Sequence, residues 1–268
     1  MKYSVAIDIG GTNTRVALAD EELNIIERKQ FATDSENPDV TLGKIAEVIK
    51  SFDCDIVGAG MSCPGPLDLI NGKILTPPNL KGQWHNLKVA EELSKLINKP
   101  VYLENDANLA GLAVVGEGKD YNYVQFFTVS TGLGAGFVIN KEIYHGAHGF
   151  GNEVANCVMM KDGPSHGSII PGGIEAISSG TAITSRAVKA GLDVKHAGEV
   201  NDLAKAGNEV AKQIMDDAKE YLANFIGVVY GYADPEIVIL GGSVALKIDG
   251  FVEEVEALAK ERVYEIMK

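Results

Sequence analysis

The chain has 268 residues, 46% of them hydrophobic, and a formal net charge of −13 at pH 7. This length allows one large or two ordinary domains with a substantial core. The acidic balance argues against a nucleic-acid-binding protein, which would need Lys and Arg clustered on one face. It does not exclude ATP, because a local glycine-rich site can bind phosphate within an acidic protein.

The sequence indicates neither secretion nor membrane insertion. The apolar stretch before Asp8 is too short for a signal peptide, and no run approaches the length of a membrane span. The three cysteines are scattered and form no CxxC pair: Cys54, Cys63 and Cys157. We therefore expect a cytoplasmic protein that binds neither membrane nor nucleic acid.

The first element is a strand that leads into a glycine turn at residues 10–14 and a second strand. Adjacent glycines let backbone N–H groups approach phosphate oxygens closely. Thr12 and Thr14 add hydroxyl donors, and Asp8 is placed to hold Mg²⁺ through water. The turn is not a Walker loop, since no GxxxxGK[ST] occurs. An ordinary hairpin turn is the alternative.

The first hundred residues predict mostly short strands and amphipathic helices. We expect strands at 3–9, 15–19, 25–32 and 56–62, helices at 38–50 and 89–97, and a hairpin turning at Asn71-Gly72. A rigid turn at 63–66 and a loop at 76–80, with Trp84, should lie beside the ligand site.

The central stretch is Glu104-Asn105-Asp106, between a buried strand and a helix predicted from Ala107 to Val115. Open α/β sheets bind ligands where strands end. An amide beside a carboxylate suits an acceptor alcohol, because the amide orients the hydroxyl and the carboxylate takes its proton. Helix capping is the alternative use of Asn105 or Asp106.

A second strand, glycine turn and strand follow at 121–130, 131–136 and 137–140. Two such hairpins, each near the start of one half, predict two similar domains facing each other across a nucleotide. Glu153, in a glycine-rich loop, is a second candidate carboxylate. His145 and His148 should be loop packing, and His85 and His196 exposed loop residues.

The C-terminal part predicts several helices and one buried strand. The helices are expected at 176–178, 182–190, 209–232 and from 250 or 251 to the end, and the strand at 236–243. Glycines at the end of that strand could accept an adenosine ring against bare backbone.

These motifs resemble the ROK family of sugar kinases, within the actin-like ATPase fold. The resemblance rests on four motifs in the family's order: Asp8-Ile9-Gly10-Gly11-Thr12, Glu104-Asn105-Asp106-Ala107-Asn108, residues 131–136, and Asp234-Pro235 with residues 238–242. It implies an α/β protein of two actin-like (ribonuclease H-like) domains, residues 1–104 and 105–268, with a central cleft.

The resemblance also implies roles for individual residues. Asp106 would be the general base that accepts a proton from the sugar 6-hydroxyl. The sugar-binding set would be Gly65, Pro78, Asn79, Asn105, Asp106, Glu153, Asn156 and Glu175. The ATP-binding set would be Asp8, Gly10, Gly11, Thr12, Asn13, Thr131, Gly132, Gly134, Gly241 and Gly242, with Asp8 also holding Mg²⁺ through water.

The sequence departs from the family at its zinc site. Many members hold zinc through a histidine of an ExGH motif and a CxCGxxGC cluster. Here Asn156 stands at the histidine position, which also alters the sugar pocket. The cysteine positions carry His166, Ser168 and Gly173. Because tetrahedral zinc needs four N or S ligands, we expect no structural zinc. A site rebuilt from His148, Cys157 and His166 is the alternative.

A second departure is at the C-terminus, where members usually continue into another strand and helix beyond the last helix. This chain ends at Lys268, so we expect weaker packing of the N-terminal domain.

The resemblance implies an ATP- and Mg²⁺-dependent kinase acting on the 6-hydroxyl of a hexose or N-acetylhexosamine, of the N-acetylmannosamine or glucose type. A β-glucoside kinase or a non-catalytic sugar or ATP sensor is the alternative. A transcription regulator of this family would carry a helix-turn-helix before the first phosphate loop, and the strand starting at Tyr3 leaves no room for it. A homodimer is expected by family analogy.

Overall fold

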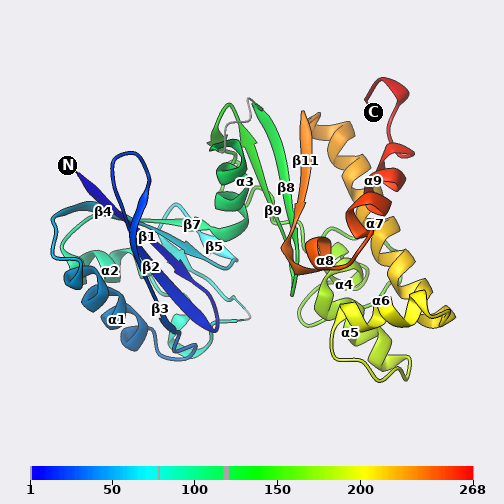
Figure 1. The fold of residues 1–268 in the computed structure, drawn as a ribbon, viewed down its shortest axis with the longest axis horizontal. Coiled ribbons are helices and arrows are strands. Elements are labelled where there is room, and N and C mark those ends of the chain that lie inside the picture. Colours follow the sequence, from blue (N-terminus) through cyan, green and yellow to red (C-terminus); the bar gives the residue numbers. More distant parts are fainter. Residues whose placement is uncertain (1, 78, 117–120, 268) are drawn as a thin grey trace. The chain divides into compact units, whose positions relative to one another are not determined.

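The computed structural model describes residues 2–77, 79–116 and 121–267 (Figure 1). Pro78, one of the expected sugar-binding residues, lies outside them. The chain forms two compact units: the first contains the residues up to Leu109 and His145–Gly151, and the second contains Ala110–Tyr144 and the residues from Asn152 onward. The predicted boundary lay between residues 104 and 105. The first unit continues to Leu109 and also includes the later segment His145–Gly151.

The first unit is built on a five-stranded sheet of order β3-β2-β1-β4-β7. Its strands are β1 (Tyr3–Ile9), β2 (Asn13–Ala19), β3 (Ile25–Ala32), β4 (Ile56–Cys63) and β7 (Val101–Asn105), beside a small hairpin of β5 (Leu67–Asp68) and β6 (Lys73–Ile74). Strands β1, β4 and β7 are parallel, so their carboxyl ends share one edge. The register aligns Asp8 with Ser62 and Ser62 with Glu104.

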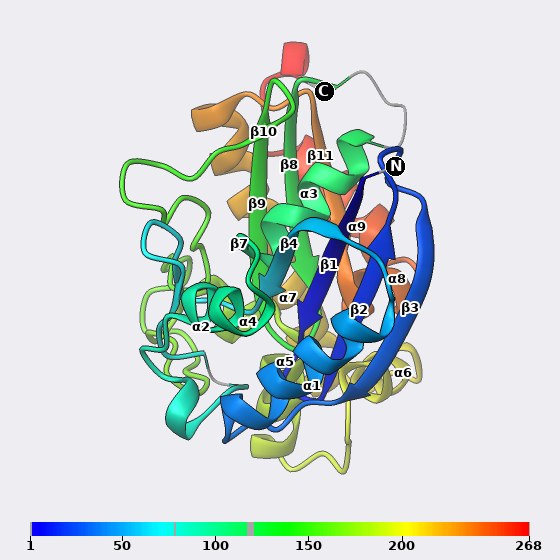
Figure 2. The ribbon, with the colours of Figure 1, turned by 90° about the vertical axis from the view of Figure 1, so that its left-hand side faces the viewer.

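Helices α1 (Pro38–Ser51) and α2 (Val89–Ile97), with the short η1 (Gly82–Trp84), share a hydrophobic core with this sheet (Figure 2). The start of α1 follows from its sequence, because Asn37 Oδ1 accepts the Asp39 N–H at 3.1 Å and proline fills the first turn. The only tryptophan, Trp84, is fully buried, and its Nε1 donates to Asp34 O at 2.8 Å.

The second unit has a four-stranded sheet of order β10-β9-β8-β11. Its strands are β8 (Tyr123–Val129), β9 (Leu133–Ile139), β10 (Glu142–Ile143) and β11 (Ile237–Gly241), and its helices are α4 (Ile174–Ser178), α5 (Gly180–Lys189), α6 (Ala197–Lys205), α7 (Glu209–Ala233), α8 (Gly242–Lys247), α9 (Phe251–Lys260) and η2 (Glu265–Met267). Helix α3 (Asp106–Gly116) begins in the first unit and continues into the second. The core includes Phe127 on Phe225, edge to face at 5.7 Å.

Several predicted boundaries were wrong. Strand β9 begins at Leu133, inside the expected glycine turn, because Gly134 and Gly136 pair with Thr128 and Phe126 of β8. The last helix ends at Lys260 rather than at the chain end. Helices α6 and α8 were not predicted at all; α8 has only six residues and begins within a Gly-Gly pair that is typical of a turn.

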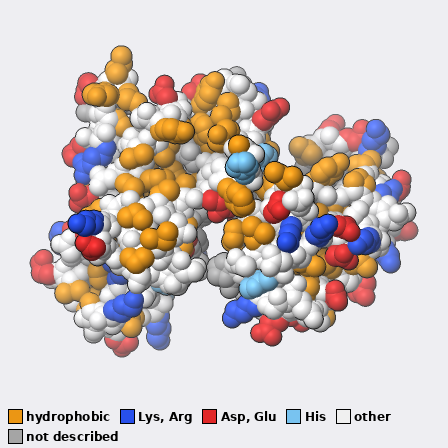
Figure 3. All heavy atoms as spheres, turned by 180° about the vertical axis from the view of Figure 1, so that it is seen from behind, with side chains coloured by type: hydrophobic (Ala, Val, Ile, Leu, Met, Phe, Trp, Pro, Cys, Tyr) orange, Lys and Arg blue, Asp and Glu red, His pale blue; other side chains and the backbone are white. Residues whose placement is uncertain are grey.

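On one face of the molecule, charged side chains are spread rather than sorted by sign. On the face shown in Figure 3, Lys and Arg are interspersed with Asp and Glu on each unit. Among the residues coloured there, that face therefore has no extended basic patch of the kind that nucleic acid requires. Within the described ranges, no helix has both the length and the apolar character needed to cross a bilayer.

Candidate functional site

The first glycine turn lies between β1 and β2 and is shorter than predicted, because β2 already begins at Asn13. Gly10 N–H donates to Asn13 O at 2.9 Å and closes the turn. A Cβ at Gly11 would lie 2.8 Å from Asn79 Cβ and from Asn79 O. Only glycine allows this approach, and it brings the expected phosphate turn against the expected sugar loop.

The prediction that the Thr14 hydroxyl donates to a phosphate was wrong. Thr14 is completely buried, and its hydroxyl pairs with that of Thr33 at 2.8 Å. The hydroxyl therefore holds β2 to the loop after β3 and is not available to a phosphate. Thr12, by contrast, is exposed and keeps its predicted role.

Asp8 lies at the carboxyl edge of the sheet, where its carboxylate has two polar partners. Its Oδ1 accepts Ser62 Oγ at 2.9 Å, and its Oδ2 accepts Arg15 Nη1 at 2.7 Å. Both side chains of the ion pair are 44% exposed, so solvent screens it and it contributes little stability. Neither Ser62 nor Arg15 was singled out from the sequence, because only strand pairing brings them to Asp8.

The segment from β7 into α3 combines capping with two available functional groups. Asn105 Oδ1 accepts the N–H groups of Ala107 at 2.9 Å and Asn108 at 3.2 Å, so the capping alternative is confirmed for this oxygen. Within the described chain no group accepts from Asn105 Nδ2. The carboxylate of Asp106 accepts the Ala107 N–H at 2.8 Å.

The two carboxylates of this edge are electrostatically coupled. Although solvent reaches Asp106, surrounding protein atoms displace water and raise the pKa of its carboxyl, and the charge of Asp8 raises that pKa further; the Ala107 N–H acts in the opposite direction. Burial, followed by the charges of Asp106 and Asp8, also raises the pKa of the Cys63 thiol. Both carboxylates therefore lie near one buried thiol.

The second glycine turn, residues 130–132, is held by two helix starts of the second unit. Ser130 O accepts Gly180 N–H at 2.7 Å, and Thr131 O accepts Thr181 Oγ1 at 2.6 Å. From the start of α8, the Ser243 hydroxyl pairs with that of Ser130 at 3.0 Å. The sequence analysis assigned no role to Gly180, Thr181 or Ser243, although a Gly-Thr pair before a helix was a usable signal.

Glu175, expected at the sugar, contacts this phosphate-type turn. Its Oε2 accepts the Leu133 N–H at 2.8 Å, and a Cβ on Gly132 would lie 2.8 Å from the same oxygen. One carboxylate oxygen therefore fixes the end of the turn. Contact of Glu175 with a sugar stays a prediction.

The glycines of the expected adenosine segment have a packing reason. A Cβ at Gly241 would lie 2.8 Å from the Phe126 ring, and one at Gly242 would lie 2.5 Å from Val129 O. Close packing of β11 and α8 on β8 thus excludes side chains here. Contact of these glycines with ATP stays a prediction.

The loop after Glu153 is fastened by Asn156, whose Oδ1 accepts the Ile170 N–H at 2.8 Å. Val158 and Gly173 form a bridge that closes the same loop. No group of three or more His, Cys, Asp or Glu suited to a metal occurs among the described residues. An amide side chain therefore ties together the segment in which the family resemblance led us to consider a zinc site.

Two other expected sugar residues lie in turns of different units. Gly65 belongs to the turn after β4 in the first unit, and its peptide bond with Pro66 is cis. Glu153 follows the turn at Gly151-Asn152 and belongs to the second unit. Contact of each residue with a sugar stays a prediction.

Comparison with known proteins decides the family. The sequence model described as the ROK family matches residues 4–268. The chain belongs to the ROK family. Its fold is the expected one, since both α/β units match ROK kinase structures of the actin-like ATPase fold.

Three proteins with similar sequences carry names that indicate different functions. The chain is 31% identical to a glucokinase of Thermotoga maritima, covering 90% of this chain and 82% of the relative. It is 29% identical to an N-acetylmannosamine kinase of Salmonella typhi (95% and 87% covered). It is 26% identical to a xylose repressor of Bacillus spizizenii (98% and 70%).

Among solved structures, the ROK hexokinase of Thermus thermophilus superposes with a TM-score of 0.88 at 28% identity. The match covers 97% of this chain and 88% of the hexokinase. Similarity to ROK kinases thus extends over nearly all of the chain.

Proposed function

We propose that the chain is an ATP-dependent sugar kinase that phosphorylates the 6-hydroxyl of a hexose or N-acetylhexosamine, of the N-acetylmannosamine or glucose type, with Asp106 as general base. The observation that carries this proposal is the position of Asp106. It begins α3 directly after a parallel strand, beside the Asp8 carboxylate and near the first glycine turn.

Proton transfer and positioning follow from the groups present. The solvent-accessible Asp106 carboxylate accepts the hydroxyl proton as the oxygen attacks phosphorus, and the Asn105 amide donates to a neighbouring hydroxyl. Phosphoryl transfer requires positioning and charge stabilisation more than covalent help. The N–H groups of a glycine turn such as the one after β1 can donate to phosphate oxygens.

A divalent cation fits beside Asp8. Burial, and to a smaller extent the like charge of Asp8, raises the pKa of Asp106, and a cation would offset the repulsion between the two carboxylates. Mg²⁺ commonly uses one or two carboxylates together with substrate phosphates and water, so Asp8 would hold it through water. When bound, it would neutralise charge on the phosphates of ATP.

The raised pKa of Asp106 predicts the acid limb of the pH profile. Activity requires the ionised carboxylate, so kcat/KM for the sugar should fall at a pH above the ordinary aspartate value of 3.8. In the protein without metal or nucleotide, where no cation offsets the repulsion, Asp8→Asn removes a like charge and should lower the pKa of Asp106, measured by carboxyl titration in NMR. An unchanged pKa of Asp106 in this variant would contradict the coupling.

Glu175 should affect the nucleotide as well as the sugar. Glu175→Ala removes the acceptor of Leu133 N–H, so the Kd for Mg-ADP measured calorimetrically without sugar should rise about 10-fold, the scale of one lost hydrogen bond to a charged group. Glu153→Ala is the matched control and should leave this Kd unchanged. An equal Kd for Mg-ADP in both variants would contradict a role of Glu175 in nucleotide binding.

The function is tested by coupled ADP release with Mg-ATP against glucose, N-acetylmannosamine, N-acetylglucosamine, fructose and a β-glucoside. Turnover stimulated by one sugar supports the kinase and names its substrate; stimulation by the β-glucoside selects the alternative specificity. The similarity to a xylose repressor favours a second candidate, a non-catalytic sugar sensor. Sugar binding without turnover by any sugar would support the sensor instead.

We also infer from family resemblance that the protein acts in the cytoplasm as a homodimer. Light scattering after size exclusion gives the mass directly, and a mass of 28.5 kDa, that of one chain, would contradict the dimer.

A further inference from the structure

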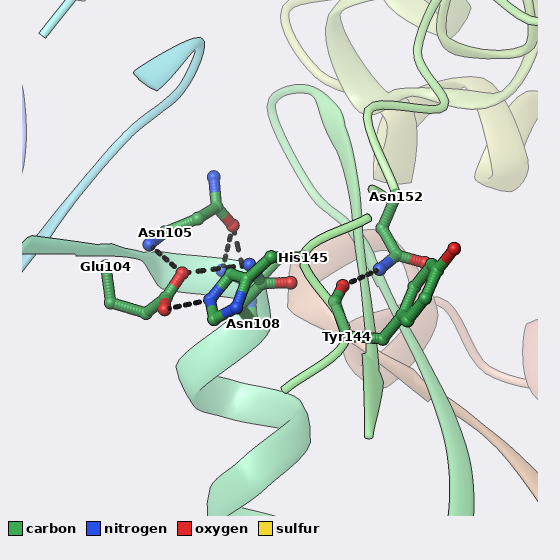
Figure 4. Close-up of polar contacts among 7 residues, drawn as sticks. Glu104, Asn105, Asn108, Tyr144, His145 and Asn152 are labelled. Atoms are coloured by element: carbon green, nitrogen blue, oxygen red, sulfur yellow. Dashed lines mark hydrogen bonds and ion pairs between the residues drawn. The ribbon is translucent and has the colours of Figure 1, made fainter. Parts of the chain in front are cut away.

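Glu104 organises the junction that carries Asn105 and Asp106 (Figure 4). Its Oε1 accepts the Asn105 N–H at 2.8 Å and Asn108 Nδ2 at 2.9 Å. Asn108 is only 4% exposed, and the contact fixes its amide, because a flipped amide would place its oxygen against the carboxylate. One carboxylate oxygen thus holds both the strand end and the first turn of α3.

The other oxygen of Glu104 binds a loop that is distant in sequence. His145 Nε2 lies 2.7 Å from Glu104 Oε2, with the glutamate side chain 16% exposed and the histidine 43% exposed. The same histidine closes its own loop, because its backbone oxygen accepts the Gly151 N–H at 2.8 Å. Figure 4 shows the imidazole directed at the carboxylate.

The loop anchored by His145 belongs to a different unit from the chain on either side of it. Residues 145–151 belong to the first unit, whereas Tyr144 before them and Asn152 after them belong to the second. Asn152 Nδ2 donates to Tyr144 O at 3.2 Å, which joins the two ends of this excursion. Glu153, an expected sugar residue, is the next residue along the chain.

We propose that Glu104 and His145 are a pair of positioning residues that sets the affinity of the kinase for its sugar. This inference rests on the proposed function. Glu104 orients Asn105 at the end of the strand, and through His145 it fixes residues 145–151 within the same unit. The contact of Asp106 with Ala107 N–H does not depend on His145, so the base itself keeps its position when the pair is broken.

The expected signature is therefore in KM rather than in kcat. His145→Ala should raise the sugar KM about 10-fold, the scale of coupling between contacting residues, with kcat and the ATP KM changed less than about 3-fold. Glu104→Gln should act in the same direction. In the double variant the sugar KM should be no higher than in the worse single variant, because both changes break one contact.

A matched control is His196→Ala, which removes another histidine beside a glutamate, Glu199 at 3.5 Å, from the start of α6 in the second unit. It should leave the sugar KM unchanged. Unchanged sugar KM in His145→Ala and Glu104→Gln, or effects that multiply in the double variant, would overturn the proposal.

Hydrogen exchange read by mass spectrometry separates this proposal from the function on which it rests. In the ligand-free protein, His145→Ala should speed amide exchange in residues 145–151 but not around α6, and equal exchange in wild type and variant would overturn the anchoring role. If the wild type phosphorylates no sugar but His145→Ala still speeds exchange in residues 145–151, the kinase function is refuted and the anchoring role of His145 is supported.

Discussion

Asp106→Asn is expected to lower kcat by about 10²- to 10⁴-fold, the usual contribution of a general base, while the protein remains folded. The substitution preserves shape, and an asparagine oxygen can still accept the Ala107 N–H that Asp106 accepts at 2.8 Å. It removes the negative charge of the carboxylate and with it the ability to take a proton. The measurement is sugar-dependent ADP release at saturating sugar and Mg-ATP, with far-UV circular dichroism to confirm folding.

The matched control for this variant is Asp39→Asn. Asp39 is also an exposed aspartate in the first turn of a helix, but that helix is α1 and Asp39 has no predicted role in the site. Its replacement removes the same charge from a comparable position and should leave kcat unchanged. Near-full turnover in Asp106→Asn, or an equal loss in Asp39→Asn, would refute Asp106 as the base.

Gly242→Ala is expected to lower the free energy of unfolding by about 2–5 kcal/mol. About 1–2 kcal/mol comes from the left-handed backbone at φ +89°, and about 1–3 kcal/mol from overpacking. The overpacking arises because the new Cβ would lie 2.5 Å from Val129 O, a backbone atom that cannot rotate away. Displacing the end of β8 should also disturb the adjoining turn at Ser130 and weaken Mg-ADP binding.

Gly207→Ala separates these two contributions. Its φ of +90° matches that of Gly242, but nothing lies within 4 Å of the added Cβ. It should lose only the backbone contribution, about 1–2 kcal/mol, and keep its Mg-ADP affinity. Urea unfolding followed by circular dichroism compares the two, since Trp84 fluorescence reports only the first unit. Equal losses of unfolding free energy in the two variants would show that the structure around Gly242 accommodates the methyl group without overpacking.

Local sequence patterns predicted most elements of the fold. The helix expected at 89–97 coincides with α2 at both ends, and the helix expected from residue 38 starts where α1 starts. These elements are fixed by side chains three or four positions apart, or by a cap beside the helix. The family motifs likewise lie in short contiguous segments, which is why the amino-acid sequence alone is enough to show the resemblance.

Glycine-rich segments were where prediction from sequence failed. Gly134 and Gly136 have low strand propensity, yet they lie in β9 because β8 pairs with them along their length. Thr14 looks like a phosphate donor in the sequence, but its hydroxyl is used by Thr33. In both cases a partner outside the glycine-rich segment itself decides the outcome.

The sequence by itself determined the family, the alternation of strands and helices, and the candidate base, because each depends on contiguous residues or on local periodicity. Only the tertiary structure decided which partners these residues have. Glu104 meets His145 across 41 positions, Leu133 meets Glu175 across 42, and Ser130 meets Ser243 across 113. Such pairs depend on strand order and helix packing, and no local pattern in the sequence encodes them.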